Sequence, residues 1–119
     1  MERIINLLPI IAICVGGWSV VNGVLHDIFI LIQHKKAYDR DLLRLLMDGH
    51  ILITCGVFQI LAYKGLQGGQ TWGYAIAGVA CISLLVYCGM IFPFLKSFGM
   101  IFINLSFLAL LVFSYFRIT

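Results

Sequence analysis

Two short polar segments, "LHD" at residues 25–27 and "MDGH" at residues 47–50, interrupt a sequence that is otherwise strongly apolar. His26 and Asp27 in the first segment, and Asp48 and His50 in the second, carry imidazole and carboxylate groups. Such groups transfer protons, bind metals or hydrogen-bond a polar ligand. An ionised carboxylate in an apolar environment is costly unless a partner compensates it, so these four residues are candidates for a functional site.

The composition indicates the environment of these segments. The chain has 119 residues, of which 62% are hydrophobic and 11% are charged, and its mean hydropathy is +1.06. A water-soluble domain of this length could not cover so many apolar side chains with polar surface. The sequence therefore predicts an integral membrane protein. Its net charge of +3 predicts attraction to anionic lipid headgroups, and we expect no nucleic-acid partner.

Four apolar stretches are visible, each near or above the length of about 20 residues that crosses about 30 Å of hydrocarbon. The predicted helices cover about residues 7–34, 42–63, 72–92 and 94–115. Short segments connect them, and Pro93 is expected to end the third helix because proline lacks the N–H that a helix needs. The predicted fold is an all-α, four-transmembrane-helix antiparallel bundle with short loops, forming a single transmembrane domain over residues 1–119.

The distribution of basic residues predicts the orientation in the membrane. The side with the first and third connections carries five basic residues and the other side three, and cytoplasmic loops are enriched in Lys and Arg. We therefore expect both termini outside, with the bacterial inner membrane as the location. The two sets are Lys35, Lys36, Arg40, Arg44 and Lys96 against Arg3, Lys64 and Arg117.

A hairpin of the first two helices, folded about Tyr38, predicts a partner for each polar segment. It brings His26 level with His50, and Asp27 level with Asp48, about 15 Å from the first connection. Asp48 and His50 are only two residues apart, however, so they point about 200° away from each other around the helix. A simpler partner for Asp48 is Arg44, one turn earlier, in a structural ion pair.

Several functions are compatible with this layer of residues. The preferred hypothesis is a site that binds or acts on a lipophilic small molecule, with Asn22 and Gln59 fixing its polar head alongside the four His and Asp residues. The sequence does not separate catalysis from binding and identifies no cofactor. The alternative is an accessory or assembly subunit of a larger membrane complex, or a homo-oligomer, in which the polar layer only holds helices together.

Three further hypotheses are less favoured. A b-type haem needs two facing imidazoles, here His26 and His50, and a metal site needs two His and two Asp converging. A proton-coupled carrier would resemble the small multidrug-type exporters in size and topology, but those place a glutamate early in the first helix. The corresponding segment here, "IIAICVGGWS" at residues 10–19, has none, which disfavours this hypothesis. The four cysteines lie within predicted helices without a C-x-x-C pair, which is typical of small buried hydrophobic residues.

Overall fold

The computed structural model describes residues 6–35, 37–93 and 98–118, and within them it contains four helices and no strand. The helices are α2 (Leu8–Gln33), α3 (Arg40–Gln67), α4 (Thr71–Ile91) and α5 (Phe98–Ile118). Each is long and apolar enough to cross a membrane. The prediction of an all-α chain with four candidate membrane spans is confirmed.

The observed helix ends follow local chemistry. α3 begins two residues earlier than predicted because the Asp39 side chain caps it, accepting a hydrogen bond of 2.8 Å from the Leu42 amide. It continues through Lys64 to Gln67 and ends before Gly69, whose φ of +65° favours glycine.

The third helix ends at the predicted break, since α4 stops at Ile91, two residues before Pro93. The rings of Phe92 and Phe98 meet edge to face, with centroids 5.4 Å apart. The predicted start of the fourth helix at residue 94 lies outside the described residues. The basic residues Arg3, Lys36 and Lys96 of the orientation argument also lie outside them.

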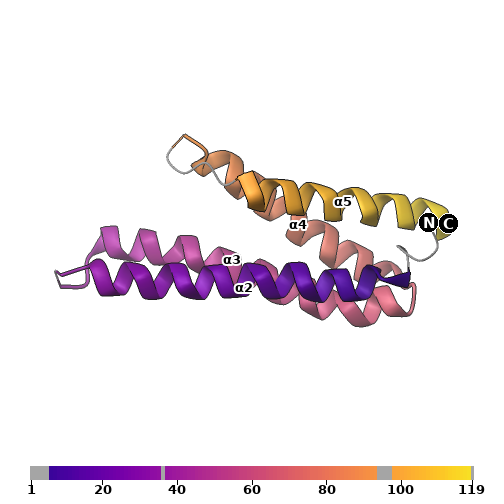
Figure 1. Cartoon of the computed structure of the whole chain (residues 1–119), viewed down its shortest axis with the longest axis horizontal. Helices are drawn as coiled ribbons and strands as arrows, with labels where there is room; N and C mark the ends of the chain where they lie inside the picture. The colour runs from indigo at the N-terminus through magenta and orange to yellow at the C-terminus, as the bar shows by residue number, and fades with distance from the viewer. Residues whose placement is uncertain (1–5, 36, 94–97, 119) are drawn as a thin grey trace.

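Helices α2 and α3 run antiparallel and side by side, as Figure 1 shows, with α4 and α5 on one side of this hairpin. α4 and α5 are also antiparallel, because Tyr74 near the start of α4 bonds to Ser114 near the end of α5 at 2.9 Å. The α2/α3 hairpin reaches beyond the end of α4 on the side of its own turn (Figure 1). The first two helices, with 26 and 28 residues, are longer than the 21-residue α4 and α5.

Glycines allow the backbones of α2 and α3 to touch at two places. A Cβ at Gly23 would lie 2.5 Å from the Gly49 carbonyl oxygen, and a Cβ at Gly56 would lie 2.5 Å from that of Gly16. Both distances are too short for any side chain, so these positions accept only hydrogen. The close approach lets dispersion forces act between the two backbones, which is the usual basis of helix association where lipid is the solvent.

Adjacent glycines provide a test of this contact. Gly16→Ala should lower the free energy of unfolding by about 1–3 kcal/mol, because its methyl group would collide with the Gly56 carbonyl and the Ile60 side chain. Gly17→Ala should be neutral or stabilising by up to about 1 kcal/mol, because nothing lies within 4 Å and alanine favours a helix. Thermal unfolding in mild detergent measures both. Equal effects of the two substitutions would contradict the proposed backbone contact.

Candidate functional site

The predicted His and Asp residues lie at one level of the hairpin but point in different directions. His26 Nδ1 is 3.5 Å from Oδ1 of the adjacent Asp27. The Asp27 carboxylate packs over Gly49 on α3, where a Cβ would lie 2.5 Å from its Cγ. Asp27 therefore reaches α3 between Asp48 and His50, and it contacts the helix where a side chain is absent.

Asp48 and His50 diverge, as their spacing on the helix requires. His50 is exposed, and its Nε2 lies 3.4 Å from Oγ1 of Thr54 on its own helix. Asp48 is half-buried and interacts with the Tyr87 side chain on α4. Among the residues that the structure describes, no hydrogen bond joins His26 to His50 or Asp27 to Asp48.

The Arg44–Asp48 ion pair stays a prediction. Arg44 is exposed, and the structure places neither Arg44 nor Asp48 in the ion pairs of His26 with Asp27 and of His34 with Asp39. The neighbour that the structure gives to Asp48 is the hydroxyl of Tyr87, a residue that the sequence does not single out. Its only sequence signal is a tyrosine within an apolar helix.

The two amides expected to fix a ligand's polar head are engaged elsewhere. Asn22 Nδ2 donates to the Trp18 carbonyl one turn earlier at 2.7 Å. Gln59 is fully buried, and its Nε2 donates to Asn104 Oδ1 at 3.0 Å and to the Cys81 sulfur at 3.3 Å. Gln59 thus links α3 to α4 and α5 at the centre of the protein.

Hydrogen-bond chemistry fixes how these buried amides are oriented. The Met100 carbonyl can only accept, so the amide nitrogen of Asn104 must face it, at 2.9 Å. The Asn104 oxygen then faces Gln59, which must present its own nitrogen. Gln59 Oε1 is left buried without a hydrogen-bond partner in the described structure. The amide pair therefore holds three helices together at some energetic cost.

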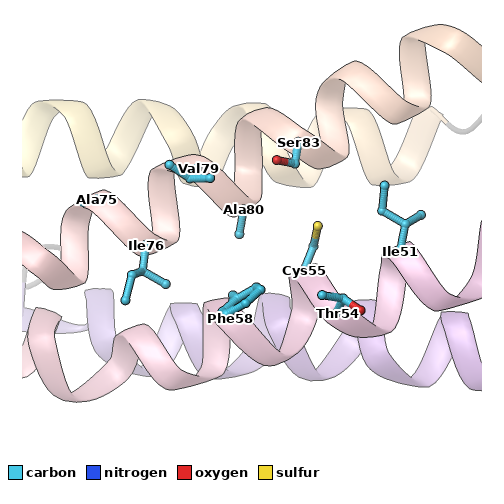
Figure 2. A pocket seen from close by; sticks show the side chains of 9 residues that line it. All are labelled: Ile51, Thr54, Cys55, Phe58, Ala75, Ile76, Val79, Ala80 and Ser83. Atoms are coloured by element: carbon cyan, nitrogen blue, oxygen red, sulfur yellow. The ribbon is translucent and has the colours of Figure 1, made fainter.

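A groove between α3 and α4 is the feature best suited to a ligand. It has a volume of about 470 Å³, within the range of about 300–1,000 Å³ that is typical of small-molecule sites. Figure 2 shows Cys55 of α3 and Ala80 of α4 pointing toward each other across it. Its nine lining residues are mostly apolar and include two hydroxyls: Ile51, Thr54, Cys55, Phe58, Ala75, Ile76, Val79, Ala80 and Ser83.

Polar side chains gather at one end of this groove. Asp48 lies about one turn from Ile51 on α3, and Tyr87 lies one turn from Ser83 on α4. The hydrogen-bonded Thr54 and His50 lie on the same part of α3. The groove therefore has an apolar wall along its length, and the Tyr87 hydroxyl and Asp48 carboxylate lie near one end.

The geometry bears on the cofactor hypotheses. The described residues contain no group of three or more His, Cys, Asp or Glu side chains that could hold a metal ion. The imidazoles of His26 and His50 are held by different partners, Asp27 and Thr54, and do not converge on a shared space. Neither a metal nor a haem is supported by these positions.

Comparison with protein-family models, curated proteins and solved structures finds no match for this chain.

Variants of the central amide pair test its structural role. Asn104→Leu should destabilise the protein by about 1–3 kcal/mol, because Gln59 would keep only the weak Cys81 acceptor while its oxygen stays unpaired. Gln59→Leu should cost less: it exchanges the unpaired Gln59 oxygen for an unpaired Asn104 Oδ1, but the Asn104 nitrogen keeps its full hydrogen bond to the Met100 carbonyl. Thermal unfolding in detergent provides the comparison.

The double variant is the control for this ranking. With both amides replaced by Leu, no buried group is left short of a partner at this point, so its stability should exceed that of Asn104→Leu alone. A double variant that loses the sum of the two single effects would mean that the amides act independently.

Proposed function

We propose that this chain is a small membrane protein that holds a lipophilic small molecule in the α3/α4 groove. The apolar part of the molecule lies along the groove wall, and its polar part lies at the end marked by Asp48 and Tyr87. The observation that carries the proposal is the combination of a groove of about 470 Å³ with polar groups at one end. An amphipathic ligand has the same two-part character.

The membrane setting supports an occupant from the lipid phase. We propose that the four helices cross the bacterial inner membrane as an antiparallel bundle, with both termini outside, from the basic-residue distribution. The lining residues Val79 and Phe58 are 64% and 48% exposed, so the groove opens on the surface that lipid would cover. A lipophilic molecule would enter it sideways without crossing a polar barrier.

Binding is favoured over catalysis by the chemistry of the groove wall. The wall carries the hydroxyls of Thr54 and Ser83 and the thiol of Cys55, and no carboxylate or imidazole. The His26–Asp27 pair, which has the residue types for proton transfer, belongs to α2, whereas the groove lies between α3 and α4. The paired imidazole and carboxylate of α2 are therefore not aimed at the bound molecule.

Filling the groove should displace the ligand. Ser83→Phe places a ring among the lining residues, and we expect the amount of co-purified lipophilic compound to fall about tenfold, as a loss of roughly 1.4 kcal/mol in affinity would produce. Solvent extraction followed by mass spectrometry of the protein purified in mild detergent measures it. Ser106→Phe is the matched control, because Ser106 is exposed on α5 and outside the groove. The proposal fails if both variants retain the same compound in the same amount.

A further inference from the structure

We propose that the molecule held by the groove is a phospholipid whose phosphate carries a primary amine, with the phosphate at Arg44 and the ammonium at Asp41. This inference rests on the proposed function, since the α3/α4 groove supplies the site for an acyl chain. It adds a headgroup class, which is read from the polar continuation of the same face of α3.

One face of α3 carries both the groove and the charged residues. Positions 41, 44, 48, 51, 55 and 58 recur at intervals of three and four residues, which places them along one side of a helix. Ile51, Cys55 and Phe58 line the groove. Asp48 on the same face meets Tyr87 of α4. Arg44 and Asp41 therefore continue the wall of the groove toward the start of α3.

The position of the end of α4 indicates how deep Arg44 and Asp41 lie in the membrane. Its 21 residues span about 31 Å at about 1.5 Å per residue, close to the thickness of a hydrocarbon layer. Asp48 is level with Tyr87, four residues before α4 ends at Ile91. Arg44 comes four residues earlier on the antiparallel α3, so it lies level with the end of α4, where lipid phosphates begin. Asp41 lies about 4.5 Å further out.

The order of charges matches the order of groups in such a headgroup. Arginine presents a fork of N–H donors that suits a phosphate. A carboxylate one turn further out accepts N–H bonds from a primary ammonium, whereas a quaternary ammonium offers no such donor. Both Arg44 and Asp41 are exposed, and neither belongs to an ion pair among the described residues. Asp48 and Tyr87 then lie at the level of the glycerol and its ester groups.

Native mass spectrometry with three lipids of identical acyl chains tests the inference. The protein in detergent is titrated with phosphatidylethanolamine, phosphatidylcholine and phosphatidylglycerol. We expect the ethanolamine lipid to bind about tenfold more tightly than the other two, as one charge-assisted hydrogen bond would produce. Equal binding of the three lipids would overturn the headgroup assignment and leave the groove proposal standing.

Charge variants assign the two contacts. Asp41→Asn should abolish the preference for the ethanolamine lipid while phosphatidylglycerol still binds, and Arg44→Gln should weaken all three lipids. Lys35→Gln is the control, because it removes a charge from the same end of the protein outside this face of α3. Asp41 lies in the first turn of α3, so unfolding of each lipid-free variant is measured, and Arg44→Lys provides a second variant that keeps the charge. An unchanged preference in Asp41→Asn would overturn the ammonium contact.

Two further measurements distinguish a failure of the headgroup assignment from a failure of the groove proposal. Ser83→Phe should weaken all three lipids equally, and full binding by that variant would refute the groove itself rather than the headgroup. Soluble phosphoethanolamine should compete poorly, because it lacks the acyl chain. Competition by it as strong as by the intact lipid would mean that the charged residues recognise a free phosphate compound, and the lipid assignment would be wrong.

Discussion

The close contact between the backbones of α2 and α3 is the constraint on which the remaining arrangement depends. Gly16 and Gly23 on α2 meet Gly56 and Gly49 on α3, and both contacts leave no room for a Cβ atom. Because the glycines are seven residues apart on each helix, both contacts lie on one face and fix the register and rotation together. That rotation places Asp27 over Gly49, and it turns the α3 residues that line the groove toward α4.

A second close contact between glycines positions α4 against α3. Gly65 near the end of α3 and Gly73 near the start of α4 are packed so closely that a Cβ on Gly65 would lie 2.5 Å from the Gly73 Cα. From this contact α4 diverges from α3 toward its own end, as Figure 1 shows. The small side chains of Cys55 and Ala80 lie in the widening space. The groove is thus a consequence of two helices that are pinned at one end and separated at the other.

The general fold is predictable from the sequence because it follows from local properties. The lengths of the apolar stretches predicted the four candidate spans, and the missing N–H of Pro93 predicted the end of α4. The first connection is short, so Asp27 must lie at the same height along the hairpin as Asp48 and His50. The directions of these side chains depend on helix rotation, which Gly23 and Gly49 determine through contacts between distant parts of the chain.

The candidate site was less predictable for the same reason. A glutamine in an apolar helix is equally compatible with a ligand contact and a helix contact, and only the position of Asn104 on α5 identifies Gln59 as the latter. The groove residues Thr54 and Ser83 are common residue types without a distinctive spacing. Their importance appears only when α3 and α4 are placed beside each other.

The location of Asp48 near the end of α4 can reduce the energetic cost of its charge without a basic partner. If α4 spans the hydrocarbon as proposed, Asp48 would lie about 6 Å inside its boundary, because Tyr87 is four residues from the end of α4. The cost of a carboxylate falls steeply toward the interface, where water and headgroups approach. The Tyr87 hydroxyl lowers it further by offering a hydrogen-bond donor. A carboxylate at this depth would also lie within reach of lipid headgroups. The position of Asp48 near the boundary would therefore both reduce the cost of its charge and make it accessible to a ligand.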